Sequence, residues 1–384
     1  MKYVIFRVAV LSLSSVLMVS CAARRKSNPI RSAPPVQTAD PYLRHATDAM
    51  KVLQHMYKPE TGLYETTGWW NSANATTVLV DYARISGRAA EYQSTLANTF
   101  VAAQKIKPGF INKFYDDEGW WALAWVDAYD LTGDARYLSM AESIFMDMAD
   151  GWDDACGGGI WWSKDRQYKN AIANELFLSV AAHLANRTQR QERQHYLEWS
   201  RRELRWFRSS GMINAQDLVN DGLGKAAGQV SGTGCTNNGQ TTWTYNQGVI
   251  LGGLAELSAD GHRDATLKLA RGIARAAIKH LADSQGVLHD PCEPKCGDDG
   301  GQFKGIFMRN LTYLYVVSPE SNLAIFIQGN ADAIWKNARS SEDQLAERWS
   351  GPYMPADAGA QSSALDALVG AATLHSNKTL HSNK

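Results

Sequence analysis

Two adjacent carboxylates, Asp116 and Asp117, are the clearest catalytic candidates in the sequence. Acidic residues at a helix start commonly cap the helix or offset its dipole, and that role stays open for this pair. An acid pair can also hydrolyse a glycosidic bond, in which one carboxyl protonates the leaving oxygen and the other attacks or activates water. Carboxyls of consecutive residues can approach the separation of about 5 Å that a retaining mechanism needs.

Aromatic residues flank the acid pair and recur in three further motifs. The chain holds 13 tryptophans, more than its 10 phenylalanines. Large aromatic side chains pack protein cores, but their flat faces also stack on ligands such as sugar rings. We expect the following aromatic residues to bind such a ligand: Trp120, Trp121, Trp161, Trp162, Trp243 and Tyr245.

Polar side chains stand at the expected starts of helices that are otherwise apolar. Amides inside an enclosed helix cost free energy unless they are hydrogen-bonded. They either bond neighbouring backbone or point into a polar cavity, and the sequence leaves both interpretations open for each residue. Their shared position at one end of the fold favours a cavity for the group. The candidate ligand-binding residues of this kind are Lys169, Asn170, Asn174, Asn246, Gln247 and Lys304.

Two kinds of helix alternate along the chain. Amphipathic segments with one apolar stripe, which is typical of surface helices, are predicted near 40–56, 89–104, 134–149, 192–207, 263–283 and 320–339. Segments that are apolar on nearly every side follow them, near 70–86, 117–131, 170–186, 243–258, 305–317 and 357–373. Strand signals are almost absent. The pattern predicts an all-α fold with six outer and six inner helices.

The expected connections between these helices are strongly asymmetric. Links from an inner to the next outer helix are short, with Gly87 and Gly133 as C-terminal caps and Asp134 as a helix start. Links from an outer to an inner helix are long. Because alternating helices run up and down, all the long loops fall at one end, where the acid pair and most tryptophans also lie. Elaborated loops on a rigid scaffold usually build a binding site, so we expect a ligand cleft at this end.

Composition excludes several classes of protein. Of the 384 residues, 45% are apolar and 20% are charged, as in a globular domain with a substantial core. The 39 basic residues equal the 39 acidic ones, whereas nucleic-acid binders concentrate positive charge, so we expect no nucleic-acid partner. Neutrality suits an uncharged ligand. The sequence carries none of the short motifs of zinc proteases, serine hydrolases or redox dithiols, and we expect no metal and no cofactor.

The N-terminal region has the pattern of an export signal. Residues 1–20 combine a basic start with an apolar run too short to span a bilayer, which predicts a signal peptide. The segment 17–21 resembles a bacterial lipobox, with Cys21 as the lipidated residue, although Met18 departs from the usual pattern. We expect residues 21–39 to be a flexible tether, 40–373 a single catalytic domain and 374–384 a tail. The protein is expected to be secreted, periplasmic or lipid-anchored.

The remaining cysteines agree with export. Cys156, Cys235, Cys292 and Cys296 form an even set, compatible with disulfides in an oxidising compartment, and their pairing stays open. Cys292 and Cys296 bracket a short loop that a bridge could close. His289 nearby permits a metal site as the alternative, but a second histidine at zinc-finger spacing is missing.

Five segments together resemble glycoside hydrolase family 76. They are residues 115–125, 156–162, 169–176, 242–248 and 303–306. The resemblance runs in order over roughly residues 45–320. It implies an (α/α)6 barrel and endo-acting α-1,6-mannanase activity with retention of configuration, on an α-mannan polysaccharide or oligosaccharide and without a metal.

The resemblance also assigns roles to the acid pair. It places the nucleophile on Asp116 and the general acid/base on Asp117, whereas the other cleft residues are our own inference from the motifs. Two alternatives remain: a transglycosylase on the same fold, and a surface lipoprotein that binds glycan without turnover. The intact acid pair argues against the second, because binding alone needs no juxtaposed acids. We expect the protein to act as a monomer.

Overall fold

The computed structural model describes residues 40–225, 234–261 and 263–382. The predicted signal peptide, the tether and Cys21 lie outside these residues. No helix in the described ranges is long and apolar enough to cross a membrane.

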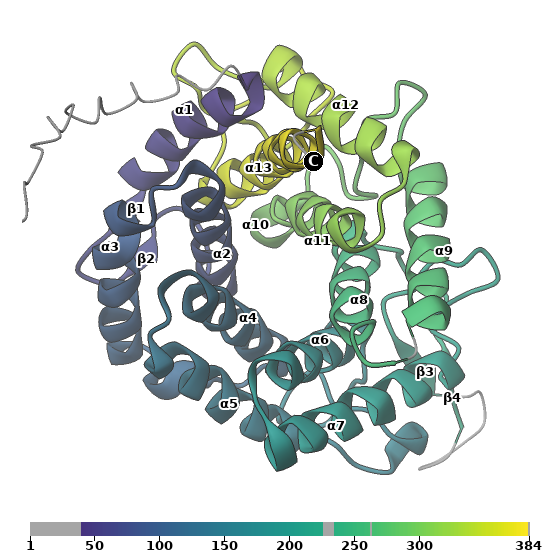
Figure 1. Cartoon of the computed structure of the whole chain (residues 1–384). Coiled ribbons are helices and arrows are strands. Elements are labelled where there is room, and N and C mark those ends of the chain that lie inside the picture. The colour runs from purple at the N-terminus through teal and green to yellow at the C-terminus, as the bar shows by residue number, and fades with distance from the viewer. Residues whose placement is uncertain (1–39, 226–233, 262, 383–384) are drawn as a thin grey trace, which may run out of the picture. The chain divides into compact units, whose positions relative to one another are not determined.

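Six helices line the middle of the described domain, and each contacts the next (Figure 1). Helix α13 also contacts α2, so the series closes into a ring. Their bounds are α2 Trp69–Ser86, α4 Tyr115–Thr132, α6 Ala171–Arg187, α8 Thr244–Leu257, α11 Phe303–Val317 and α13 Ala358–Ser382. They match the six segments predicted to be enclosed, except that α13 continues past residue 373 into the predicted tail.

Six amphipathic helices surround this ring (Figure 1). Each packs its apolar stripe against an inner helix, as α5 does with its buried residues from Tyr137 to Met148 against α4. Their bounds are α1 Pro41–His55, α3 Ala89–Ala102, α5 Ala135–Ala149, α7 Arg190–Ser209, α9 Arg263–Leu281 and α12 Ser321–Asn337. These helices confirm the all-α expectation. The arrangement has a physical reason: a helix with one apolar face must bury that face, and a helix without a polar face must be enclosed.

Caps fix the short connections as expected. Gly87 and Gly133 adopt φ of 69° and 73° after α2 and α4, a left-handed conformation that glycine tolerates without strain. The side chain of Asp134 accepts a hydrogen bond from the Arg136 amide and starts α5. Each inner helix therefore turns into its outer neighbour within a few residues.

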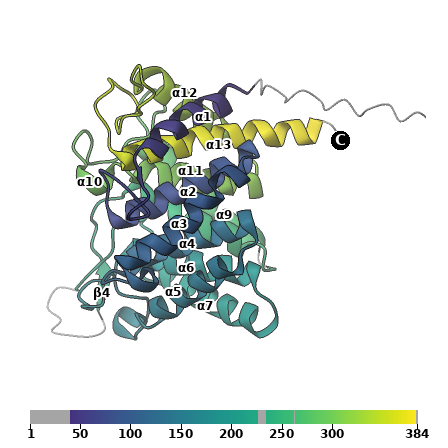
Figure 2. The same ribbon diagram turned by 90° about the vertical axis from the view of Figure 1, so that its left-hand side faces the viewer.

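The long loops contain the remaining short elements and gather at one end of the domain (Figure 2). Strands β1 (Tyr57–Lys58) and β2 (Leu63–Tyr64) form one hairpin, and β3 (Leu223–Lys225) pairs with β4 (Cys235–Asn237). The short helices are η1 Ala103–Lys105, η2 Pro108–Phe110, η3 Ala155–Gly157 and α10 Gly297–Gly300.

Two disulfides tie these loops together. Cys156 pairs with Cys235, which joins the loop before α6 to β4. Cys292 pairs with Cys296 and closes the short loop before α10, as its spacing suggested. The structure thus settles a pairing that the cysteine count alone left open.

Candidate active site

The acid pair lies in the first turn of α4, on the end of the ring that carries the long loops. Asp116 Oδ2 accepts a hydrogen bond from the indole Nε1 of Trp162 at 3.1 Å. Asp117 Oδ2 accepts one from Nδ2 of Asn112 at 2.5 Å. The other oxygen of Asp116 is buried and has no hydrogen-bond partner. Residues of two long loops therefore hold the two carboxyls from different sides.

Burial raises the pKa of both carboxyls. It raises the pKa of Asp116 to about 8, and repulsion from Asp117 adds to the shift. Burial also raises the pKa of Asp117 to about 6, against the opposing effect of the hydrogen bond from Asn112. Interacting carboxyls titrate as a pair, so there is a pH range in which one holds a proton while the other is ionised. Acid catalysis by one and nucleophilic attack by the other need that asymmetry.

A buried network fixes the loop that carries Asn112. The Asn112 amide donates to Oε1 of Glu118 at 2.9 Å, and Lys164 pairs with the same oxygen at 2.9 Å. The side-chain oxygen of Asn112 accepts the Phe114 amide at 2.7 Å, so its NH2 group must face Asp117. Sequence reasoning missed Asn112. Its only signal was its place in a long loop, four residues before the acid pair.

A row of aromatic rings borders the same end of the ring of helices. Trp70 stacks on Trp120 with centroids 5.6 Å apart, and on its other side Trp70 lies 6.2 Å from Phe303. Phe303 stacks on Tyr245 at 4.0 Å and meets Trp243 edge to face at 5.6 Å. Four inner helices or their starts supply these rings. The structure thus brings Trp120, Trp243 and Tyr245 together as predicted, and adds Trp70 and Phe303 to them.

Hydrogen bonds join the aromatic row to Asp221 and Tyr168. Trp243 Nε1 donates to Asp221 at 3.1 Å, and the hydroxyl of Tyr168 donates to the other oxygen of Asp221 at 2.5 Å. Burial raises the pKa of Tyr245, and the charges of Asp221 and Asp116 raise it further. Trp162 remains 38% exposed beside Asp116.

Trp121 and Trp161 do not join this row. Trp121 is fully buried and packs on Phe110 at 4.8 Å and on Trp125 at 5.6 Å, so it belongs to the core. Trp161 is half-buried, and its Nε1 donates to Asp153 at 2.7 Å. A helix presents consecutive residues to different sides, so Trp120 and Trp121 of α4 do not share one face.

Both candidate lysines are enclosed in the protein. Lys169 is 0% exposed at its side chain, and its ammonium bonds Asp153 Oδ1 at 2.7 Å and the carbonyls of Ala155 and Gly158 at 2.7 and 2.8 Å. Lys304 is buried against Glu293 and the carbonyl of Glu347. An ammonium whose donors already bond protein oxygens has none left for a ligand hydroxyl. The structure therefore places both as supports of the loops.

Three of the four candidate amides bond backbone. Asn170 caps α6, Asn174 bonds both the N–H and the C=O of Ile160 at 2.7 and 2.9 Å, and Gln247 does the same to Val219 at 2.8 and 2.8 Å. These amides hold loop backbone that would otherwise lie buried and unpaired. Asn246 is different, because it is fully buried and neither atom of its amide has a hydrogen-bond partner.

The fold and the acid pair agree with a large class of enzymes, the glycoside hydrolases. Residues 42–383 match the profile of glycosyl hydrolase family 76. The chain belongs to this family, as the five sequence segments indicated.

Named relatives of the chain come from fungi. The mannan endo-1,6-alpha-mannosidase DFG5 of Candida albicans is 24% identical over 329 residues, which cover 78% of this chain and 71% of that protein. DFG5 of Saccharomyces cerevisiae is 28% identical over 246 residues, or 59% of this chain and 52% of that protein. The chain spans less than two thirds of the length of some of these relatives.

Two bacterial proteins are among the solved structures of similar fold. An inactive variant of an alpha-1,6-mannanase of Salegentibacter sp. HEL1_6, with two consecutive aspartates replaced by alanine, was solved with alpha-1,6-mannotetrose. It gives a TM-score of 0.78 at 23% identity and covers 87% of this chain and 100% of that chain. The Lin0763 protein of Listeria innocua gives 0.75 at 26% identity, over 88% of this chain and 98% of that chain.

Proposed function

We propose that the protein is a retaining glycoside hydrolase that cleaves α-1,6-mannosidic bonds within mannan. The observation that carries the proposal is the pair of adjacent, half-buried carboxyls, Asp116 and Asp117, at the end of the inner helices that also carries a row of aromatic rings. The names of the fungal relatives and the mannotetrose complex of the bacterial mannanase support the substrate class. That the inactive bacterial variant lacks two consecutive aspartates supports the pair.

The proposed mechanism is a double displacement. Asp117 protonates the glycosidic oxygen while Asp116 attacks the anomeric carbon, which forms a mannosyl ester and releases the leaving sugar. Asp117 then takes a proton from water, which attacks the ester and frees Asp116. The aromatic row would stack on mannose rings, with Trp162 and Trp70 as contact faces and Tyr245 as a hydroxyl partner near the acids.

The proton must sit on the correct carboxyl for these roles. Burial raises the pKa of both carboxyls, so in the free protein the pair can hold one shared proton. The substrate's glycosidic oxygen therefore has to draw the proton to Asp117 on binding. If it does not, the two residues exchange roles.

The first experiment tests the pair itself. Wild type, Asp116→Asn and Asp117→Asn are incubated with linear α-1,6-mannan, and released oligosaccharides are measured. We expect release by wild type and a loss of several orders of magnitude in each variant. Release that survives both substitutions would refute the proposal. Binding without release by wild type would favour a glycan-binding protein, and longer products from short donors would favour a transglycosylase.

Azide assigns the role of each carboxyl. With an aryl α-mannoside, Asp116→Ala plus azide should give the β-mannosyl azide, because azide replaces the missing nucleophile and inverts the centre once. Asp117→Ala plus azide should give the α-mannosyl azide, because azide then opens the mannosyl ester. The opposite products would show that Asp117 is the nucleophile and Asp116 the general acid/base.

We propose the finer features of fold and location on the same basis. The closed series of inner helices with its outer partners agrees with the (α/α)6 barrel that the family resemblance implied. Two disulfides agree with an oxidising compartment and hence with export. The lipid anchor at Cys21 is a separate proposal, and a Cys21→Ser variant that fractionates with membranes like wild type would refute it.

A further inference from the structure

A second cavity lies inside the ring of inner helices, away from the acid pair. It has a volume of about 620 Å³, within the usual range for small-molecule sites. Most of its wall comes from the C-terminal parts of α2, α4 and α6, from the end of α8, and from α11 and α13. Most of the cavity thus lies towards the opposite end of the inner helices from the acids. Trp120 of the aromatic row, three residues after Asp117 in α4, lines it as well.

Carboxylates outnumber cationic groups in this cavity. Three arginines line it, Arg84, Arg187 and Arg309, and burial lowers the pKa of the lining His183, which favours a neutral ring. The ends of the helices add partial negative charge, since their last carbonyls point the same way. The lining carboxylates are Asp81, Asp127, Asp130, Glu256 and Asp366.

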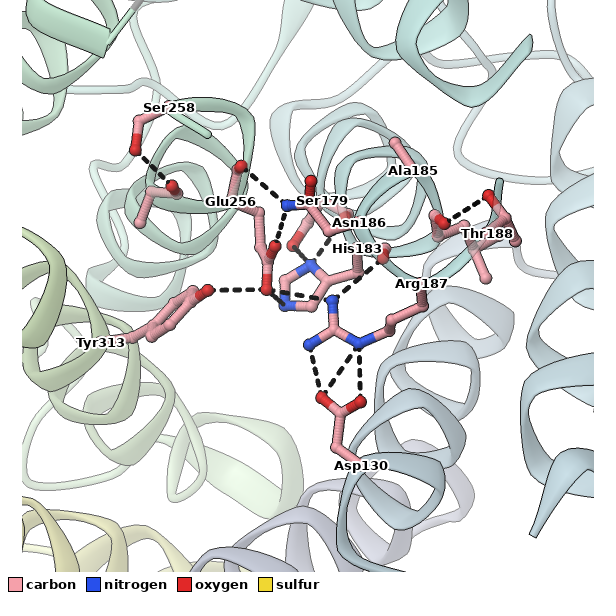
Figure 3. A network of polar contacts seen from close by, with 12 residues as sticks. Asp130, Ser179, His183, Ala185, Asn186, Arg187, Thr188, Glu256, Ser258 and Tyr313 are labelled. Atoms are coloured by element: carbon pink, nitrogen blue, oxygen red, sulfur yellow. Dashed lines mark hydrogen bonds and ion pairs between the residues drawn. The ribbon is translucent and has the colours of Figure 1, made fainter. Parts of the chain in front are cut away.

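All three guanidinium groups are already engaged by the protein. Figure 3 shows Arg187 between Asp130 and Glu256, with contacts of 2.9 Å to Asp130 and 3.1 Å to Glu256. The other oxygen contacts of Glu256 include the hydroxyl of Tyr313 at 2.6 Å. Arg309 binds both oxygens of Asp366 at 3.1 Å, and Arg84 pairs with Asp81 at 2.7 Å. Each arginine that lines the cavity is therefore already paired with a carboxylate of the protein.

Asp127 is the carboxylate left without a partner. Among the described residues it makes no hydrogen bond and no ion pair, and it is half-buried with its side chain on the cavity wall. Burial and the charge of Asp81 raise its pKa to about 7. Burial likewise raises the pKa of Asp366 to about 8, although Arg309 opposes the shift. The cavity lacks enough positive charge to keep all its carboxylates ionised.

Apolar side chains stand next to this unpaired acid. Leu123 is one helical turn before Asp127 on α4, and Ile85 is one turn after Asp81 on α2, so both share the wall with the acids. Val316 and Val369 line the cavity from α11 and α13. Arg84 and Arg187 act on Asp127 only through their charges, which oppose the rise in its pKa. A molecule that fills the space would meet one carboxylate without a hydrogen bond or ion pair and an apolar surface beside it.

We propose that this cavity binds a small organic cation, with its ammonium group on Asp127 and its apolar body along Leu123 and Ile85. A primary ammonium supplies the donors that the unpaired carboxylate lacks, and the pair is strengthened where water is excluded. Trp120 also lines the cavity and adds an aromatic side chain to its wall. The site is separate from the proposed mannan cleft and does not depend on mannan hydrolysis.

Calorimetric titration with hexylammonium chloride tests the proposal, with 1-hexanol and hexanoate as neutral and anionic probes of the same length. Wild type should bind hexylammonium saturably, with 1-hexanol weaker by about tenfold or more and hexanoate not bound. Asp127→Asn, which keeps the side-chain shape, should weaken hexylammonium binding by about tenfold or more and leave 1-hexanol unaffected. No saturable binding of hexylammonium, or equal binding of hexylammonium and 1-hexanol, would overturn the proposal.

Three controls locate the binding in this cavity. Asp264→Asn makes the same substitution on an exposed position of α9 and should bind like wild type. The Asp116→Asn, Asp117→Asn double variant should also bind like wild type, and lost binding there would place the cation at the acid pair instead. Leu123→Trp should reduce binding by filling the space, with circular dichroism to confirm that each variant is folded. Unchanged binding in folded Leu123→Trp and Asp127→Asn would overturn the proposal.

Discussion

Asn112 holds Asp117 through a hydrogen bond of 2.5 Å from Nδ2 to Oδ2. The orientation of the amide is fixed, because its oxygen accepts the Phe114 amide at 2.7 Å. An N–H donor favours the ionised carboxylate, so Asn112 opposes the effect of burial on the pKa of Asp117. The asparagine thus sets how readily the proposed general acid gives up its proton.

Asn112→Ala should therefore raise the pKa of Asp117 further. A hydrogen bond to a charged group is worth about 1.5–3 kcal/mol, which corresponds to about one to two pH units. Because the general acid must be protonated, the basic limb of kcat/KM against pH on mannan should move to higher pH by that amount, and kcat should fall. Asn322→Ala, at an exposed position of α12, should leave both limbs in place. A lower kcat with unmoved limbs would assign Asn112 a purely structural role.

Lys169 should affect stability and not substrate affinity. Lys169→Met leaves four carbonyl oxygens and the Asp153 carboxylate without their shared donor, which should cost about 3 kcal/mol in urea unfolding. KM for mannan should stay within about twofold in the folded fraction, because the ammonium is enclosed. Lys113→Met, whose exposed partner is Asp165, should cost less than about 1 kcal/mol. A large rise in KM at unchanged stability would return Lys169 to the binding site.

Glu256 should make the fold sensitive to acid. Burial raises its pKa, but His183 and Arg187 outweigh burial and lower the pKa to about 2. A carboxyl with a lowered pKa contributes stability above its unfolded pKa and loses it as the pH falls towards the folded value. The shift corresponds to about 3 kcal/mol, present at neutral pH and lost between about pH 5 and pH 2.

Urea unfolding of wild type and Glu256→Gln at several pH values measures this contribution. The variant should be less stable at pH 7, and the difference between the two proteins should shrink as the pH falls. The raised pKa values of Asp127 and Asp366 act on both proteins alike. Glu192→Gln, exposed on α7, serves as the control and should follow wild type. A difference that stays constant with pH would exclude an ionised Glu256 as the cause.

The two disulfides should contribute unequally. Cys156 and Cys235 are 79 residues apart, whereas Cys292 and Cys296 are 4 apart. Closing a longer loop removes more entropy from the unfolded chain, so removing the first bridge should cost about 4 kcal/mol and the second about 2 kcal/mol. Paired Cys→Ser variants in urea unfolding compare them. Equal losses would show that native-state contacts, and not loop length, decide the effect.

The sequence by itself determined the fold class and the order of its helices. The stripe on segment 134–149 predicted the surface helix α5, and the enclosed pattern of 170–186 predicted the inner helix α6. Hydrophobic periodicity is a local property of the sequence, so it predicts a helix without knowledge of tertiary contacts. The same holds for Gly87 and Gly133, because a cap needs only a residue that tolerates positive φ.

The sequence also located the acid pair and the end of the fold that carries it. It could not separate ligand-facing from structural side chains. Trp120 and Trp121 are adjacent, alike and both buried, yet Trp120 stacks on Trp70 of the aromatic row whereas Trp121 packs on Phe110 and Trp125. The sequence motif suggested that Lys169 donates to the ligand, but its side chain is buried and pairs with Asp153.

Only the tertiary structure decided those cases, and the reason is physical. Whether an amide or ammonium is free depends on which distant backbone lies beside it, as Ile160 does for Asn174. Asn112 gained its role from a carboxyl five residues away that the helix start turns towards it. The cavity around Asp127 arises from six helices at once, and its excess of carboxylates cannot be seen in a chain whose total charge is zero.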